Sequence, residues 1–327
     1  MAEIRYIDAI NQAHHEEFAR DDRVLVMGED VGRKGGVFGA TMGLYEKFGP
    51  ERVIDTPLAE SSIAGVAIGM AANGLFPIAE FQFADFIHPA FNQIVSEAAR
   101  MRYRSNNAFG CPVVFRAPWG GSHGTALYHS QSIEAFYAHV PGMKVVAPYT
   151  PYDAKGLLKA AVRDPDPVLF LEHKRMYRTV RGEVPEGDFT VPIGPATVRR
   201  EGTDLSIFAY GWMLHESLGA AETAAKEGVS AEVVDLRTLK PLDTETILNS
   251  VRKTNRALIV YEDNEFCGYG AEVAALIAEE AFADLDAPVI RLAAPDVPGI
   301  PFAKPLEEWF FIDQEKILEA IRRLAAH

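Results

Sequence analysis

Cysteine is scarce in this chain of 327 residues, which contains only Cys111 and Cys267. The two are far apart and form no CxxC pair, so a disulfide-stabilised secreted fold and a cysteine-ligated zinc site are both excluded. The first 22 residues are amphipathic and acidic, unlike a signal or transit peptide. We therefore expect a protein of a reducing compartment, the bacterial-type cytoplasm.

Positive charge is also in short supply. The chain has 32 Lys and Arg against 46 Asp and Glu, a net charge of −14, and no run of basic residues. This balance argues against nucleic acid or an anionic membrane as a partner. The longest uncharged run, residues 61–79, is interrupted by Ser, Asn, Pro and several Gly. It predicts a buried helix followed by a strand rather than a membrane span.

Short apolar runs alternate with amphipathic segments through the first half of the chain. This alternation predicts an α/β fold in which a parallel sheet is covered on both faces. The predicted strands lie at 24–30, 52–57, 77–83, 112–118, 144–148 and 167–173, and the predicted helices at 4–20, 61–72, 88–104, 130–139 and 152–164.

The stretch 181–204 is rich in Gly, Pro and charge and predicts a linker, after which the alternation resumes in a second, smaller α/β domain. We place a first domain at 1–185, a linker at 186–202 and a second domain at 203–327. The strands predicted in the second domain lie at 204–211, 230–237, 256–263 and 287–294, and its helices at 213–227, 243–253, 271–283 and 313–325.

The phosphate loop GxxxxGK[ST] is missing, and CGYGAEVA at 267–274 is only a weak match to a dinucleotide fingerprint. GGSHG at 120–124 matches G-x-S-x-G and follows a predicted strand, which would make Ser122 the nucleophile of a hydrolase. However, the loop continues as TALYHSQ before any helical pattern begins. The alternative is a glycine loop that lets a ligand approach the backbone.

Glu60 precedes the uncharged run, and two interpretations of it compete. It is either an acid in the first turn of a helix, favoured by the helix dipole, or a partly desolvated acid that shares a proton with a bound group. His129 precedes Ser130, a possible N-cap, where the dipole favours the neutral imidazole needed for proton exchange, although a structural role is open too. Phe86 either fills the core or stacks on a flat heterocycle.

Five motifs in this order and spacing, GEDVG, DTPLAE, AEFQFADF, PWGGSHGTALYHSQS and PGMKVVAP, resemble the beta subunit of the thiamine-diphosphate-dependent 2-oxoacid dehydrogenases. That family includes the pyruvate, branched-chain and acetoin dehydrogenases, and the likeness covers essentially the whole chain. It implies a transketolase-like pyrimidine-binding domain followed by a transketolase C-terminal-like domain. It also implies oxidative decarboxylation of a 2-oxoacid with transfer of the acyl group to lipoamide.

The resemblance assigns roles to the candidate residues. Glu60 is expected to hydrogen-bond the aminopyrimidine ring of the cofactor, supported by the apolar helix that excludes water. Phe86 is expected to stack on that ring. His129 is expected to assist proton transfer as the acyl group passes to lipoamide, with His123 as a weaker second candidate. A potassium site with oxygen ligands is also implied, at Val113, Ala161, Val162, Asp164 and Asp166.

The chain has no GDG motif, which in this superfamily holds the diphosphate and its Mg²⁺. We therefore expect an alpha subunit to supply that half of the site in an α2β2 heterotetramer. The lipoyl acyltransferase core of the complex is expected as a further partner. ALYHSQSIEAFYAH and AEFQFADF look closer to the branched-chain type, so a substrate such as 2-oxoisovalerate is preferred, with pyruvate and acetoin dehydrogenases as alternatives.

Overall fold

The computed structural model describes residues 2–327 and divides into two compact units. The first unit comprises the chain up to Trp119 together with Phe136–Ile193, and the second comprises Gly120–Ala135 and Gly194–His327. The glycine-rich segment 120–135 thus makes most of its contacts with the C-terminal part of the chain. None of the helices in residues 2–327 is both long and apolar enough to cross a bilayer.

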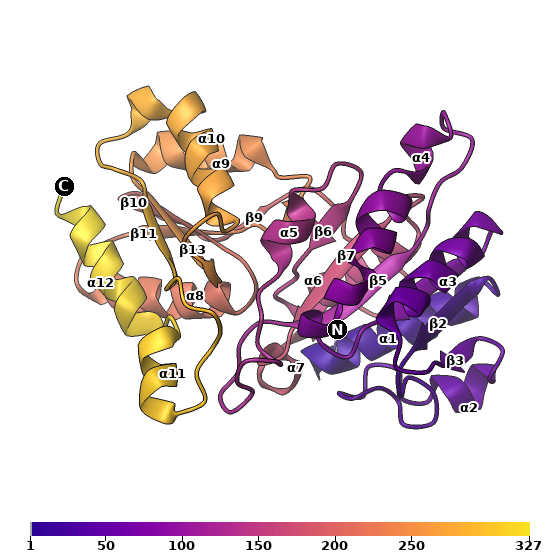
Figure 1. Cartoon of the computed structure of the whole chain (residues 1–327). Helices are drawn as coiled ribbons and strands as arrows, with labels where there is room; N and C mark the ends of the chain where they lie inside the picture. The colour runs from indigo at the N-terminus through magenta and orange to yellow at the C-terminus, as the bar shows by residue number, and fades with distance from the viewer. Residues whose placement is uncertain (1) are drawn as a thin grey trace. The chain divides into compact units, whose positions relative to one another are not determined.

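A parallel sheet with strand order β6-β7-β5-β4-β2-β3 forms the centre of the first unit (Figure 1). Its strands β2, β5 and β7 are buried along their whole length, as a sheet covered on both faces requires. The strands of this unit are β1 (Ala2–Arg5), β2 (Val24–Gly28), β3 (Val53–Asp55), β4 (Phe76–Glu80), β5 (Val114–Trp119), β6 (Lys144–Val146), β7 (Val168–His173) and β8 (Arg181–Val184).

Helices α1 and α6 pack against each other, and α3 packs against β4. Helix α6 begins with Pro after Thr150, whose hydroxyl accepts a hydrogen bond from the amide of Asp153 at 3.0 Å. The helical segments of the unit are α1 (Tyr6–Arg20), α2 (Leu44–Phe48), α3 (Glu60–Ala72), η1 (Ala84–Phe86), η2 (His88–Ala90), η3 (Gln93–Ala98), α4 (Met101–Arg104), α6 (Pro151–Val162) and α7 (Met176–Thr179). Helix α5 (Glu134–Ala138) lies where the chain passes from the second unit back to the first.

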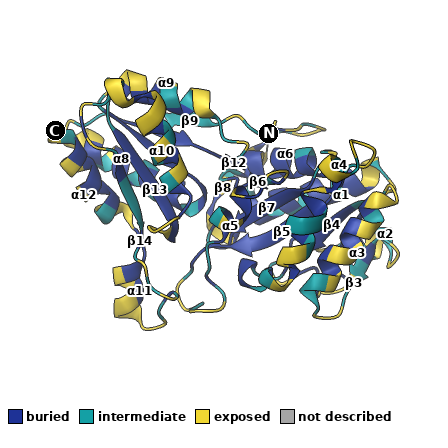
Figure 2. Cartoon of the chain, turned by 45° about the horizontal axis from the view of Figure 1, so that its top comes forward, coloured by how far each residue is buried: buried dark blue, intermediate teal, exposed yellow. Residues whose placement is uncertain are grey.

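The second unit is built on a five-stranded sheet of order β14-β13-β10-β11-β9, in which only the edge strand β9 runs antiparallel. Strands β10, β11 and β13 of this sheet are almost wholly buried, whereas β9 and most of β14 are only partly buried and the outer helices carry exposed faces (Figure 2). The elements are β9 (Thr197–Arg200), β10 (Leu205–Ala209), α8 (Gly211–Lys226), β11 (Ala231–Asp235), β12 (Thr238–Lys240), α9 (Thr244–Thr254), β13 (Ala257–Asn264), α10 (Gly270–Glu280), η4 (Phe282–Asp284), β14 (Ile290–Ala294), α11 (Lys304–Phe310) and α12 (Gln314–Ala325). The predicted α/β class, with two mostly parallel sheets, is confirmed.

Several predicted elements differ from those observed. The helix predicted at 88–104 is divided into a 3₁₀ turn, a π-helical turn and the short α4, and the π turn is closed by a hydrogen bond from the Ala99 amide to the Ile94 carbonyl at 3.0 Å. The segment predicted as a linker contains β8, which pairs with β1, and β9, which pairs with β11. Apolar periodicity does not reveal β8 and β9, because both are only partly buried and form no continuous apolar run.

Candidate active site

Glu60 is the first residue of α3 and is half-buried. The loop after β2 and the loop that leads from β3 to Glu60 are linked, because the Gly32 amide donates to the Asp55 carboxylate at 2.7 Å and the Thr56 amide donates to the Gly28 carbonyl at 2.9 Å. A Cβ atom on Gly32 would lie 2.4 Å from an oxygen of Asp55, so this contact needs glycine. The motifs GEDVG and DTPLAE are thereby joined at the carboxyl ends of β2 and β3.

Glu29, which follows β2, is a further candidate residue that the sequence analysis did not single out. Burial raises the pKa of Glu29, and the negative charges of Glu60 and Asp30 raise it further. Within residues 2–327, neither the Glu29 nor the Glu60 carboxylate has a side-chain hydrogen bond or an ion pair. A carboxylate directly after a buried parallel strand was the available signal, since ligands bind at that edge of such sheets.

Helix α3 is not buried on all sides, contrary to the sequence prediction. Its inner face is apolar, but Leu58 in the preceding loop and Val66 are 77% and 47% exposed. Ser62, Gly65 and Gly69 lie on the same exposed, uncharged side. The expected exclusion of water is therefore achieved on one side of the helix only within this chain.

Phe86 ends the 3₁₀ turn η1, directly after β4, and is half-buried. Its ring meets Phe83 edge-on, with centroids 5.7 Å apart, so it is part of an aromatic cluster rather than an isolated ring. The next turn, η2, packs against α3, and the Ser61 hydroxyl donates to the Pro89 carbonyl at 2.5 Å. The start of α3 and the turn that carries Phe86 are thus linked within one unit.

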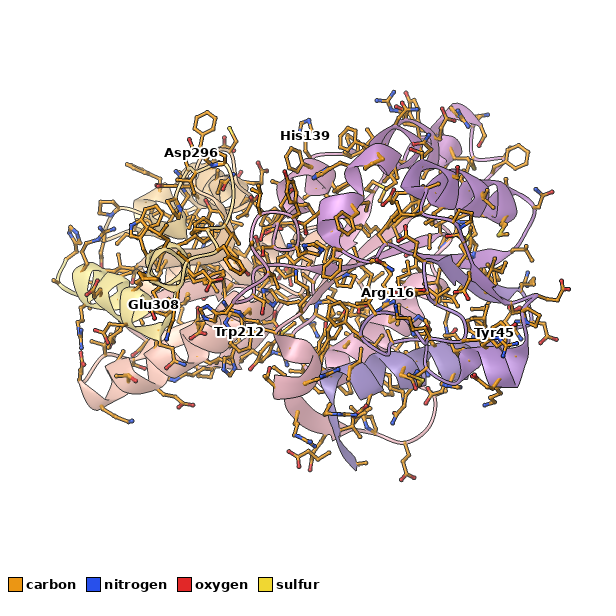
Figure 3. All side chains as sticks on the ribbon, turned by 60° about the horizontal axis from the view of Figure 1, so that its bottom comes forward. Tyr45, Arg116, His139, Trp212, Asp296 and Glu308 are labelled. Atoms are coloured by element: carbon orange, nitrogen blue, oxygen red, sulfur yellow. The ribbon has the colours of Figure 1, made fainter. Side chains whose placement is uncertain are left out.

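A second set of carboxylates lies at the same sheet. Arg116 of β5, labelled in Figure 3, hydrogen-bonds Glu80 of β4 on one side and Glu172 of β7 on the other, the latter with one bond of 2.8 Å. Tyr177 donates to Glu172 at 2.7 Å, and the two carboxylates and the guanidinium are at most 3% exposed. Burial and the charge of Glu172 raise the pKa of Glu80, while Arg116 opposes this.

His123 and His129 lie in the second unit, on the loop between β5 and α5. The predicted helix at 130–139 begins only at Glu134, so His129 is not at a helix N-terminus and the dipole argument for it is wrong. The Ser130 hydroxyl instead pairs with the Thr125 hydroxyl at 2.5 Å.

Ser122 does not have the surroundings of a hydrolase nucleophile. No helix follows it directly, its carbonyl accepts hydrogen bonds from Thr125, and among residues 2–327 its hydroxyl bonds no histidine. His123 points its Nδ1 at Glu307 instead, at 3.2 Å. The hydrolase interpretation therefore has no support in the geometry.

The residues predicted to bind potassium lie close together, because the loop after α6 runs beside the chain before β5. The Cys111 amide donates to the Pro165 carbonyl at 3.0 Å, for example. Both carboxylates already have a cation: Lys144 lies 2.6 Å from Asp164, and Arg102 lies 2.5 Å from Asp166. An ion bound there would share these carboxylates with Lys144 and Arg102. In the described part of the chain, no three His, Cys, Asp or Glu side chains form a candidate metal centre.

Each of the two units matches a known domain family. Residues 2–180 match the transketolase pyrimidine-binding domain, and residues 194–317 match the transketolase C-terminal domain. The chain is 60% identical over 325 residues to the 2-oxoisovalerate dehydrogenase subunit beta of Bacillus subtilis (strain 168), covering 99% of each chain. It is 50% identical over 324 residues to the pyruvate dehydrogenase E1 component subunit beta of the same organism, again covering 99% of each.

A solved structure described as a split gene transketolase, inactive beta4 tetramer, is also similar. It has a TM-score of 0.79 and 27% sequence identity, and the match covers 99% of this chain and 98% of that one. The motifs, the two domain matches and the full-length relatives agree. The chain belongs to the beta-subunit family of the thiamine-diphosphate-dependent 2-oxoacid dehydrogenases.

Proposed function

We propose that the chain is the beta subunit of the decarboxylating component of a branched-chain 2-oxoacid dehydrogenase, with 2-oxoisovalerate as a typical substrate. The higher identity to the 2-oxoisovalerate dehydrogenase subunit than to the pyruvate dehydrogenase subunit, 60% against 50%, supports this choice of substrate. Pyruvate remains the second candidate, on the strength of that 50% identity.

The observation that carries the proposal is the half-buried carboxylate of Glu60 at the start of α3, beside Glu29 and without a cation partner within residues 2–327. Such a carboxylate can exchange a proton with a ring nitrogen, and the half-buried ring of Phe86 on a linked turn offers a flat surface for a heterocycle. These residues fit the aminopyrimidine half of thiamine diphosphate. When bound, the cofactor supplies the electron sink for decarboxylation.

Each candidate residue then has a separate task. Glu60 holds a proton at the pyrimidine ring, Phe86 orients that ring, and His129 moves a proton as the acyl group passes to lipoamide. The remaining half of the cofactor, the diphosphate with its Mg²⁺, is assigned to an alpha subunit, because the sequence has no GDG motif. Potassium at the loop after α6 stays a prediction, with the carbonyl and carboxylate ligands named above.

Two further observations support an alpha partner in an α2β2 assembly. The exposed side of α3, next to Glu60, is uncharged and includes Leu58 and Val66, which water contacts in the single chain. The similar split-gene transketolase chain is described as inactive when it forms a tetramer of beta chains. The lipoyl acyltransferase core is proposed as the further partner, and the cytoplasm as the location.

The test is co-expression with the alpha subunit, followed by measurement of CO₂ release from 2-oxoisovalerate and from pyruvate. We expect the complex to favour 2-oxoisovalerate by about tenfold or more in kcat/KM, because the two acyl chains differ by two methyl groups. The chain alone should release no CO₂. An assembled complex that prefers pyruvate would refute the substrate assignment, and one inactive on both would refute the function.

A further inference from the structure

Two buried carboxylates of the second unit hold the backbone of the histidine loop, which we define as residues 120–131. The amide of Gly121 donates to Glu262 of β13 at 2.7 Å, and the amide of Gly124 donates to Glu307 of α11 at 2.7 Å. The other oxygen of Glu307 lies 3.2 Å from Nδ1 of His123. Hydrogen bonds to a charged acceptor are among the stronger ones in proteins.

In helix α11, the side chain of Glu307 is buried, whereas those of Leu306 and Trp309 are exposed to solvent. The Glu307 side chain is 4% exposed, whereas Leu306 and Trp309 are more than half exposed. Most of α11 is coloured as exposed in Figure 2. A carboxylate is costly to bury unless hydrogen bonds compensate it, and the histidine loop provides such bonds.

Close packing adds to these bonds. The His123 ring meets the Phe311 ring edge-on, with centroids 5.1 Å apart. A Cβ atom on Gly121 would lie 2.4 Å from the Phe311 ring, and one on Gly299 would lie 2.0 Å from Leu127. The histidine loop and the segment 299–311 therefore approach each other closely at two glycines.

Bonds within the loop connect the Glu307 contact to His129. Thr125 follows Gly124, and its hydroxyl pairs with that of Ser130 at 2.5 Å. The Gly120 amide donates to the Gln131 carbonyl at 3.3 Å, which closes the base of the loop. Holding the backbone at residue 124 thus limits the positions open to residue 129.

We propose that Glu307 is a positioning residue for the histidine loop. It does not touch the reacting atoms; it holds the Gly124 amide and the His123 ring, and through them the backbone that carries His129. The consequence for catalysis rests on the proposed function, in which His129 serves the transfer to lipoamide. Loss of Glu307 then impairs that transfer more than decarboxylation, because Glu60 and Phe86 belong to the other unit.

The first readout is hydrogen exchange of the loop amides in the assembled complex. Glu307→Ala should raise the exchange rate of a peptide covering residues 120–131 by about tenfold, because it removes two bonds to a charged group. Glu307→Gln should have a smaller effect, since its amide oxygen still accepts from Gly124. The control is Glu308→Ala, an exposed neighbour labelled in Figure 3 that should change nothing.

The second readout is the ratio of two rates: acylation of a lipoyl domain, and CO₂ release with ferricyanide as the electron acceptor. Glu307→Ala should lower the first about tenfold more than the second. Should this variant fail to fold, the Gln variant decides, through faster loop exchange and a smaller drop in the same ratio.

Unchanged loop exchange, or equal losses in both rates, would overturn the proposal. A wild-type complex inactive on 2-oxoacids would refute the proposed function instead, while the exchange experiment would still test the role of Glu307 in holding the loop.

Discussion

Two pairs of carboxylates in the first unit lie at the carboxyl ends of one parallel sheet and have opposite surroundings. Glu80 and Glu172 are buried on either side of Arg116, which hydrogen-bonds both. Glu29 and Glu60 influence each other electrostatically but have no cation partner within residues 2–327. Through Arg116 of β5, Glu80 and Glu172 link the three strands β4, β5 and β7. Glu29 and Glu60 have no such cation and can therefore exchange protons with a bound group. Position at the sheet edge therefore does not separate the two pairs; the presence of the Arg116 guanidinium does.

Replacing Glu60, which has no cation partner within residues 2–327, should have the largest effect on activity. In the assembled complex, Glu60→Gln should lower CO₂ release by about 10²–10⁴-fold, because an amide cannot exchange a proton with the pyrimidine ring. Assembly, followed by gel filtration, should not change. Glu51→Gln, an exposed control, should keep full activity. Retained activity in the Glu60 variant would place Glu60 with the structural acids.

Removing Arg116, the cation between Glu80 and Glu172, should mainly affect the stability of the fold. Arg116→Met leaves Glu80 and Glu172 buried without their partner, and should lower the free energy of unfolding by about 3–5 kcal/mol in urea titrations followed by circular dichroism. The control Arg104→Met breaks an exposed pair with Glu97 and should cost less than about 1 kcal/mol. Equal effects of the two substitutions would show that the buried network does not hold the strands.

Asp263, in β13 of the second unit, combines features of both pairs. It is buried, as Glu80 and Glu172 are, but it has no ion pair within residues 2–327. Burial raises its pKa to about 6, opposed by a hydrogen bond from the Asn264 amide. Because the folded-state pKa is above the ordinary value, stability is lost as pH rises from about 4 to about 6. Asp263→Asn stays neutral, so it should be more stable than wild type by about 3 kcal/mol at pH 7 and nearly equal to it at about pH 3.

Urea titrations at the two pH values would measure this difference. A variant with the same pH dependence as wild type would show that Asp263 ionises at its ordinary pKa in the folded protein.

Most of the fold was predictable because local patterns encode it. Helix α3 begins at Glu60 and ends at Ala72, close to the predicted 61–72, since small and apolar residues without Pro favour a helix there. The buried parallel strands of both sheets were found because they are continuous apolar runs, whereas the antiparallel edge strand β9 was missed. The pairing of β1 with β8 was missed, because its residues lie about 180 positions apart and are half exposed.

The residues of the candidate site likewise include some that the sequence revealed and some that it did not. Glu60, Phe86 and His129 stand in motifs with a definite order and spacing. Glu307 was missed because its helix has seven residues and contains both Pro and two exposed apolar side chains, a pattern that resembles a loop. Glu29 was missed because the sequence alone does not show that the carboxylate after β2 is buried and close to Glu60.

The sequence by itself determined the α/β class, the two domains and the motifs of a thiamine-dependent beta subunit, because apolar period and motif spacing are properties of neighbouring residues. Only the tertiary structure decided which acids are neutralised by Arg116, which side of α3 faces water, and which carboxylates hold the histidine loop. Those outcomes depend on residues far apart in sequence, such as Gly124 and Glu307, that come together only when the unit folds.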